Sequence, residues 1–212
     1  MRIVGSLAKS FGPWIVYGEC EKICTDNSDY PIWKSMRHST LHSYDGGIVK
    51  KIEHRGVRER FFKLFDSQAK REAVSAERLR SMGLSTPRIY GYATSLSPLC
   101  DIESIIAMEY IPHRKVAGRI FRDSLDTTER MTLLQNILTD ISIMLDNGVL
   151  TKDLHFANIL VKDDLSTVWI DNDLVNVRNE KEMRFYMRKI SDDRRLGDDE
   201  KSEIASLIAR FL

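Results

Sequence analysis

The chain has 212 residues, of which 42% are hydrophobic and 30% charged, so it can bury a sizeable core and is not expected to be disordered. Its 32 basic and 31 acidic residues argue against a dedicated nucleic-acid-binding protein, whose domain is normally distinctly basic. No stretch approaches the roughly 18 uninterrupted apolar residues of a membrane span, and no secretory signal is apparent. Three cysteines cannot close a disulfide framework, and Cys20 and Cys24 stand without a second metal-binding pair, so buried thiols are favoured over zinc. We expect a cytoplasmic protein of one domain, or of one domain with two lobes.

The N-terminal half gives uneven signals of secondary structure. The first 45 residues contain only short β-prone pieces, whereas the apolar residues after a turn at Gly46 and Gly47 predict a strand over residues 48–54. Ser67 and Gly83 are typical of the two ends of a helix, and two predicted strands follow, over residues 88–94 and 104–111.

The C-terminal half has a stronger pattern. Asp126 and Glu129 have the spacing of a capping box, and the apolar residues after them recur with a helical period until Gly148. A polar loop over residues 151–158 follows this long helix. Further along we expect strands over residues 159–161 and 167–170 and an amphipathic helix over residues 204–211. The segregated strands and helices indicate an α+β fold.

Three side chains after the long helix suggest phosphoryl transfer. Asp153 and Asn158 lie five residues apart in the polar loop, and Asp171 ends the hairpin that follows. This chemistry needs one carboxylate to accept the proton of the attacking hydroxyl, and amide and carboxylate oxygens to hold Mg²⁺ on ATP. The alternative is that Asp153 and Asn158 only stabilise the loop, and that Asp171 only starts a turn.

Two further elements fit a nucleotide site. Lys50 lies in the strand over residues 48–54, and Glu72 lies on or beside the apolar side of the next helix, so the helix carboxylate could hold a lysine that grips the phosphates. The neighbouring Lys51 points to the other face of the strand, so only one of the two lysines can do this. Glu109 and Ile111 end an apolar strand where the adenine edge would meet the backbone; the alternative is a plain strand end.

These motifs resemble a known family. From about Ile48 to Gly197 the chain is similar to the bacterial lipopolysaccharide core kinases, a branch of the protein-kinase-like superfamily, and most of all to the heptose kinases. A His two residues after the Asp is typical of sugar and antibiotic kinases, whereas ordinary protein kinases carry Lys there. The segments that carry the resemblance are Ile48-Val49-Lys50, the basic run that leads to Glu72, Ala107-Met108-Glu109-Tyr110-Ile111, Asp153-Leu154-His155-Phe156-Ala157-Asn158 and Ile170-Asp171.

The resemblance implies a protein-kinase-like, two-lobed α+β fold with a shortened C-lobe. The N-lobe would span residues 1–109 and the C-lobe residues 110–212. The implied activity is ATP-dependent phosphorylation of a sugar hydroxyl, with a heptose of the lipopolysaccharide inner core as the favoured acceptor. Asp153 would be the base, and Asn158 and Asp171 would hold Mg²⁺. The nucleotide would be bound by Lys50, Glu72, Glu109 and Ile111.

Some features depart from this pattern. No G-x-G-x-x-G loop precedes Lys50, Lys152 replaces the usual Arg, Asn172 and Asp173 replace Phe-Gly, and only 41 residues follow Asp171. The rival interpretations are a kinase acting on another small molecule, an antibiotic or a protein, and a pseudokinase that binds a partner without turnover.

A basic and aromatic run suggests where a glycolipid surface would be met. Arg55, Arg58, Arg60 and Lys63 accompany three phenylalanines, so the protein could lie peripherally at the inner face of the membrane. The alternative is that the phenylalanines pack under the neighbouring helix and the arginines are simply solvated.

Overall fold

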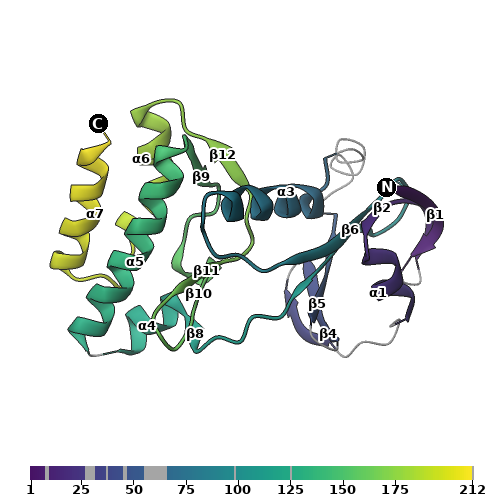
Figure 1. Ribbon diagram of the computed structural model, residues 1–212, viewed down its shortest axis with the longest axis horizontal. Helices are drawn as coiled ribbons and strands as arrows, with labels where there is room; N and C mark the ends of the chain where they lie inside the picture. The colour runs from purple at the N-terminus through teal and green to yellow at the C-terminus, as the bar shows by residue number, and fades with distance from the viewer. Residues whose placement is uncertain are drawn as a thin grey trace. The chain divides into compact units, whose positions relative to one another are not determined.

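The computed structural model describes residues 1–7, 10–26, 32–36, 38–44, 47–54, 66–97, 99–124 and 126–211. The chain forms two compact units (Figure 1). The first unit consists of Met1–Ala76 and Pro87–Ile111, and the second of Glu77–Thr86 and Pro112–Leu212. The basic and aromatic run at residues 55–65 lies outside the described residues, and so does Gly46.

The first unit is built on an antiparallel sheet. Among the described residues seven strands pair in the order β1-β2-β6-β7-β5-β4-β3. The strands are β1 (Arg2–Leu7), β2 (Ser10–Gly18), β3 (Ile32–Met36), β4 (Ser39–Tyr44), β5 (Gly47–Glu53), β6 (Ile89–Ser95) and β7 (Ile102–Glu109), and the helices are α1 (Cys20–Asp26) and α3 (Gln68–Ser81), whose last turns belong to the second unit.

The alternation of side chains along β5 separates two small cores. Val49 packs in a cluster with Trp14 and with Cys20 of α1. Ile52 packs with Ala69 of α3 in the other cluster. Because successive residues of a strand point to opposite faces, α1 and α3 cover opposite faces of the sheet, and Lys50 shares the α3 face with Ile52.

The strand and helix predicted around this core are confirmed. β5 covers Gly47–Glu53, and α3 begins after Ser67, whose Oγ accepts a hydrogen bond from Lys70 N at 3.3 Å. Gly83 follows α3 with a φ of 85°, a left-handed conformation that favours glycine at this position. The strands from β1 to β4 were not predicted, and in β1 every residue except Val4 and Leu7 is exposed, which explains the weak apolar signal there.

The second unit surrounds the long helix α5. Leu133, Ile137, Ile141 and Met144 lie buried along one face of this helix, as its apolar period predicts. Figure 1 shows α5, α6 and α7 together on one side of the unit. The elements are β8 (Lys115–Val116), α4 (Ala117–Asp123), α5 (Thr127–Asp146), β9 (Val149–Thr151), the 3₁₀ turn η1 (Phe156–Asn158), β10 (Ile159–Val161), β11 (Thr167–Trp169), β12 (Leu174–Asn176), α6 (Glu180–Ser191) and α7 (Asp198–Arg210).

The start of α5 corrects one detail of the sequence analysis. Asp126 caps the helix, since its Oδ1 accepts from Thr128 N at 2.9 Å and Glu129 N at 3.2 Å. The reciprocal half of the capping box is wrong. The Glu129 carboxylate instead accepts from Ser124 Oγ at 2.6 Å and from Arg114 at 2.5 Å, and a charged guanidinium is a stronger partner than a backbone amide.

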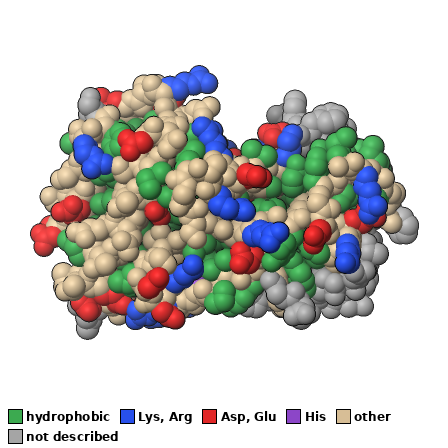
Figure 2. Space-filling view, viewed as in Figure 1, with side chains coloured by type: hydrophobic (Ala, Val, Ile, Leu, Met, Phe, Trp, Pro, Cys, Tyr) green, Lys and Arg blue, Asp and Glu red, His purple; other side chains and the backbone are tan. Residues whose placement is uncertain are grey.

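The molecule therefore has the α+β architecture that its sequence predicts. None of the helices in the described part of the chain is long and apolar enough to span a bilayer. On the face shown in Figure 2, acidic and basic side chains are interspersed among the coloured residues, in keeping with the balanced overall charge.

Candidate functional site

The loop that carries Asp153 is fixed by the short strands around it. β9 pairs with β12, with Thr151 opposite Leu174, and Lys152 N extends the pairing by donating to Asp173 O at 2.8 Å. The residues after β9 therefore run beside the residues that precede β12. This pairing brings the Asp153 loop next to the segment that contains Asp171.

Asn158 links the loop to the hairpin. Its Nδ2 donates to the backbone oxygen of Asp153 at 3.1 Å, while its own backbone oxygen accepts from Ile170 N at 3.0 Å. Asn158 thus contacts the backbone of Asp153 and the backbone of Ile170, which directly precedes Asp171. Because Nδ2 is used within the loop, the amide oxygen Oδ1 is the atom available to bind a cation.

Asp171 has an unusual backbone conformation. Its φ is 54°, in the left-handed region that residues other than glycine, asparagine and aspartate rarely adopt. The next residue, Asn172, is buried and donates from Nδ2 to Trp169 O at 2.9 Å. This hydrogen bond closes a sharp turn directly after β11, with the exposed Asp171 at its corner.

His155 shapes the loop through its backbone. Its carbonyl accepts from Asn158 N at 3.0 Å, which closes the 3₁₀ turn. The buried side-chain Nδ1 has no hydrogen-bond partner among the described residues. The loop is therefore held in shape without a hydrogen bond from that atom.

A lysine from α6 contacts the Asp153 carboxylate. Lys189 Nζ lies 2.5 Å from Asp153 Oδ1, and both side chains are about half exposed. This hydrogen bond is the main reason why the pKa of Asp153 is lower than its usual value, with burial opposing it and the charges of Lys189, His155 and Lys152 adding to it. The carboxylate is therefore held in its ionised form.

Lys50 and Glu72 form a buried ion pair in the first unit. Lys50 Nζ lies 2.8 Å from Glu72 Oε1, and the two side chains are only 5% and 7% exposed. Gln68 Nε2 donates to the same carboxylate oxygen at 2.9 Å. The glutamate on the apolar side of α3 is thus explained by a charge partner and a neutral donor, as buried carboxylates require.

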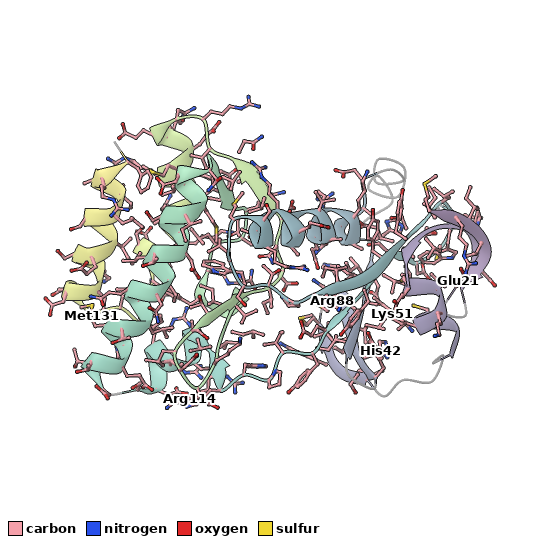
Figure 3. All side chains as sticks on the ribbon, viewed as in Figure 1. Glu21, His42, Lys51, Arg88, Arg114 and Met131 are labelled. Atoms are coloured by element: carbon pink, nitrogen blue, oxygen red, sulfur yellow. The ribbon has the colours of Figure 1, made fainter. Side chains whose placement is uncertain are left out.

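Lys51, labelled in Figure 3, follows Lys50 directly in β5, so it points to the opposite face of the strand. Its positive charge acts on Cys24 of α1, whose pKa is lowered first by a hydrogen bond with Cys20 and also by Lys51, against the effect of burial. The two adjacent lysines are therefore in different surroundings, and Lys50 is the one that meets the α3 carboxylate.

Glu109 and Ile111 lie at the end of β7. Glu109 is the last residue of the strand, opposite Gly47, and its backbone N donates to Arg88 O at 2.8 Å. Its side chain accepts from Arg88 N at 3.1 Å, so it fastens the start of β6. Ile111 follows outside the described strands and helices and is the last residue of the first unit.

Three residues at these sites were missed by the sequence analysis. Lys189 lies 36 positions from Asp153, in a helix that was not predicted, so no local pattern pointed to it. Gln68 stands one helical turn before Glu72, and that spacing was a usable signal. Asp140 of α5 accepts hydrogen bonds from Thr167 Oγ1 and from Trp169 Nε1, the latter at 2.7 Å, and so holds β11 in place.

No group of three or more His, Cys, Asp or Glu side chains in the described part of the chain could hold a metal ion unaided. The oxygen donors of Asn158 and Asp171 nevertheless suit Mg²⁺, which proteins usually bind through one or two carboxylates together with substrate phosphates. The chemistry of these donors therefore fits a metal that arrives with a nucleotide.

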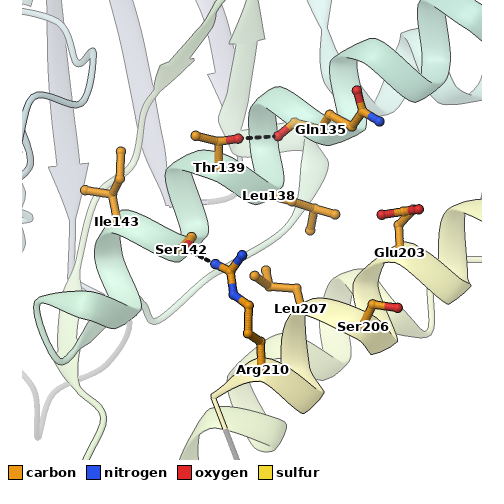
Figure 4. A pocket seen from close by; sticks show the side chains of 9 residues that line it. All are labelled: Gln135, Leu138, Thr139, Ser142, Ile143, Glu203, Ser206, Leu207 and Arg210. Atoms are coloured by element: carbon orange, nitrogen blue, oxygen red, sulfur yellow. Dashed lines mark hydrogen bonds between the residues drawn. The ribbon is translucent and has the colours of Figure 1, made fainter.

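Two hollows of the second unit lie apart from these residues. A groove of about 420 Å³ runs between α5 and α7, lined by residues that include Leu138, Leu207 and Arg210 (Figure 4). Another, of about 410 Å³, is lined by His113, Arg114 and Lys162 among others. None of the predicted site residues lines either hollow.

Comparison with solved structures shows which proteins share this fold. No protein-family model and no curated protein matches the chain. A crystal structure of WbdD is similar with a TM-score of 0.58 and 13% identity over 86% of this chain and 45% of WbdD. Another structure, described as the bifunctional kinase-methyltransferase WbdD, has a TM-score of 0.54 and 12% sequence identity, and the match covers 82% of this chain and 42% of that one. The structure of WaaP in complex with acyl carrier protein has a TM-score of 0.55 and 14% identity, and the match covers 86% of this chain and 79% of WaaP.

The chain thus spans less than half the length of WbdD. Likenesses at 12–14% identity establish the fold and leave substrate and activity open. The protein has the α+β, protein-kinase-like fold that the sequence analysis expected.

Proposed function

We propose that the protein is an ATP-dependent kinase that phosphorylates a sugar hydroxyl. The observation that carries this proposal is the hydrogen-bonded arrangement of Asp153, Asn158 and the turn at Asp171. It brings two aspartates and an asparagine together on adjoining backbone segments, and these residue types can supply the proton acceptor and the Mg²⁺ ligands that phosphoryl transfer needs.

Asp153 would act as the base. Its ionised carboxylate accepts the proton of the acceptor hydroxyl as the acceptor oxygen bonds to the γ-phosphorus of ATP. The bond between that phosphorus and the bridging oxygen breaks, and ADP leaves. A carboxylate held by a cation remains ionised at neutral pH and can orient the hydroxyl before transfer.

Asn158 Oδ1 and the Asp171 carboxylate would hold Mg²⁺. When bound with ATP, the ion neutralises the charge that develops on the β- and γ-phosphates. The turn at Asn172 presents Asp171 at an exposed corner, and the Asn158 side chain is oriented by its hydrogen bond within the loop. Both proposed ligands would thus be held on backbone that is fixed by hydrogen bonds.

The first unit would bind the rest of the nucleotide. Lys50, held by Glu72, would contact the phosphates, and the backbone of Glu109 and Ile111 would meet the adenine edge. The proposed lobes are residues 1–109 and 110–212. The hairpin β3–β4, which precedes β5 and pairs with it, is the candidate for covering the phosphates in place of a Gly-rich loop.

The favoured acceptor is a heptose of the lipopolysaccharide inner core. This choice rests on the resemblance of the Asp153-Leu154-His155-Phe156-Ala157-Asn158 loop to the heptose kinases. The protein would then work in the cytoplasm on a glycolipid at the inner face of the membrane, with the basic run at residues 55–63 as the proposed contact. Kinases of other small molecules or proteins share the same groups, so acceptor profiling has to decide the substrate.

A pseudokinase is the second candidate. The sequence has no G-x-G-x-x-G loop before Lys50, which favours this alternative. A pseudokinase would bind a partner and would not transfer phosphate.

A transfer assay tests the proposal. Lipopolysaccharide purified from a strain that lacks the gene is incubated with the full chain and γ-labelled ATP, and mass spectrometry locates the added phosphate. Wild type should transfer phosphate, and Asp153→Asn should lower turnover by roughly 10²–10⁴ while sparing MgATP binding. Near-wild-type turnover in Asp153→Asn would show that the base is another group, and MgATP binding without transfer to any acceptor would favour the pseudokinase.

A further inference from the structure

The ion pair between Lys189 and Asp153 joins helix α6 to the proposed catalytic loop. The 2.5 Å contact is made to one carboxylate oxygen, Oδ1. Within the described part of the chain, no hydrogen bond to the second oxygen, Oδ2, accompanies it. With side chains 48% and 61% exposed, the pair is open to a substrate.

The contact between Lys189 and Asp153 contributes too little to the stability of the fold for stability to explain it. An ion pair with this much exposure is screened by solvent and contributes little to the free energy of unfolding. Arg188, the next residue of the helix, forms an ordinary surface pair with Asp192 one turn later, at 2.9 Å and even more exposed. Lys189 instead reaches across to a loop 36 residues away, and to the very carboxylate that the proposed reaction uses.

The position of Lys189 is set by a packed helix. Met187 and Ile190, on either side of it in α6, are 0% and 1% exposed, and they anchor the helix in the core of the second unit. Asn179 caps its first turn by accepting from Glu182 N at 3.0 Å. The ammonium group is therefore delivered by a rigid element, which is what precise orientation of a reacting group requires.

We propose that Lys189 is a positioning residue for phosphoryl transfer, and this inference rests on the kinase function proposed above. By holding Oδ1, its ammonium group fixes the rotation of the Asp153 side chain so that Oδ2 meets the acceptor hydroxyl. The proton of that hydroxyl passes to Oδ2 as its oxygen bonds to the γ-phosphorus. Lys189 exchanges no proton and no covalent bond in this step.

The test compares charge-matched variants of neighbouring residues. Lys189→Gln and Arg188→Gln each remove one positive charge from the same helix, and Lys189→Arg keeps a donor at the site. The full chain is assayed with γ-labelled ATP and the same purified lipopolysaccharide, and kcat, the KM for ATP and Tm are measured for each variant. We expect Lys189→Gln to lower kcat by about 10- to 100-fold with the KM for ATP and Tm unchanged. Lys189→Arg should retain most of the rate, and Arg188→Gln should match wild type.

Each contrary result has a distinct meaning. An active wild type with Lys189→Gln at a similar kcat would overturn the positioning role and leave the kinase function standing. An equal loss in Arg188→Gln, or a loss of kcat that tracks a fall in Tm, would also overturn it, by showing a general charge or structural effect. A wild type that transfers no phosphate to lipopolysaccharide or to any acceptor in the profile would overturn the kinase function and this inference together.

Discussion

Lys50 and Lys51 are chemically identical neighbours, and the two faces of β5 give them different surroundings. Lys50 meets the buried Glu72, and Lys51 acts on Cys24. We predict that Lys50→Met weakens MgATP binding by roughly 10- to 100-fold, because one hydrogen bond to a charged group is lost. Lys51→Met should change the affinity for MgATP little. Isothermal titration calorimetry measures both. The opposite ranking would move the phosphate contact to Lys51.

The same ion pair makes Lys50→Met a stability variant as well. It removes the lysine charge beside the buried Glu72 carboxylate, to which Gln68 Nε2 still donates, so unfolding should become easier by about 3 kcal/mol. Adding Glu72→Gln removes the uncompensated charge and should restore most of that stability without restoring affinity for MgATP. Recovery of both would show that Lys50 acts only through the fold, and denaturant titration beside calorimetry separates the two.

Asp171 combines a proposed metal ligand with a left-handed backbone, so the choice of substitution matters. Asparagine adopts this conformation more readily than alanine. Asp171→Asn therefore removes the charge while keeping the turn at φ 54°. We predict that it weakens Mg²⁺-dependent nucleotide binding and turnover together, with Tm near that of wild type. An unchanged Mg²⁺ dependence would exclude Asp171 as a metal ligand.

Asp140 shows how one helix holds the strand that leads to the site. Trp169 is 1% exposed, and its Nε1 donates to the Asp140 carboxylate at 2.7 Å. Asp140→Ala would leave this buried donor without its acceptor, so we predict a loss of about 1–3 kcal/mol in the free energy of unfolding. Asp140→Asn keeps a carbonyl acceptor and should lose less. Equal losses in chemical denaturation would show that the negative charge, and not the hydrogen bond, holds β11.

Elements with a strong apolar period were predictable, and those without it were not. α5 buries an unbroken apolar face, and β5 follows a turn signal, so both were placed within a residue or two. α6 carries many charges, and its buried Met183, Met187 and Ile190 were overlooked although they fall at helical spacing. Strands of two or three residues such as β8, β9 and β12 are too short to show any period.

In the candidate site, likewise, some residues could be predicted from the sequence and others could not. Asp153 and Asn158 are close in sequence, and a motif could name them. The contact of Lys189 with Asp153 depends on tertiary packing over 36 positions, and no local pattern in the sequence encodes it. The hydrogen bond between Trp169 and Asp140 likewise joins residues that are 29 positions apart in the sequence. Motifs can identify the reacting groups, whereas the groups that orient them require the fold.

For the molecule as a whole, the two units each have their own packed apolar clusters. The proposed function requires the folded chain to bind MgATP, so MgATP should stabilise it by mass action, whether or not phosphate is transferred. At about 100-fold excess over Kd the gain is about 2.7 kcal/mol. For a chain of this length that corresponds to a rise in Tm of about 5–10 °C.

We predict this rise for wild type and for Asp153→Asn, because the proposed base would not be a ligand of the nucleotide. It should be much smaller for Asp171→Asn, and smaller for wild type when EDTA removes Mg²⁺. Differential scanning fluorimetry with MgATP, MgADP and ATP plus EDTA measures all of these. A shift that survives EDTA would indicate a metal-independent nucleotide site, as a pseudokinase could have. A wild type with no shift in any nucleotide would contradict nucleotide binding itself, since a ligand that prefers the folded state has to raise its stability.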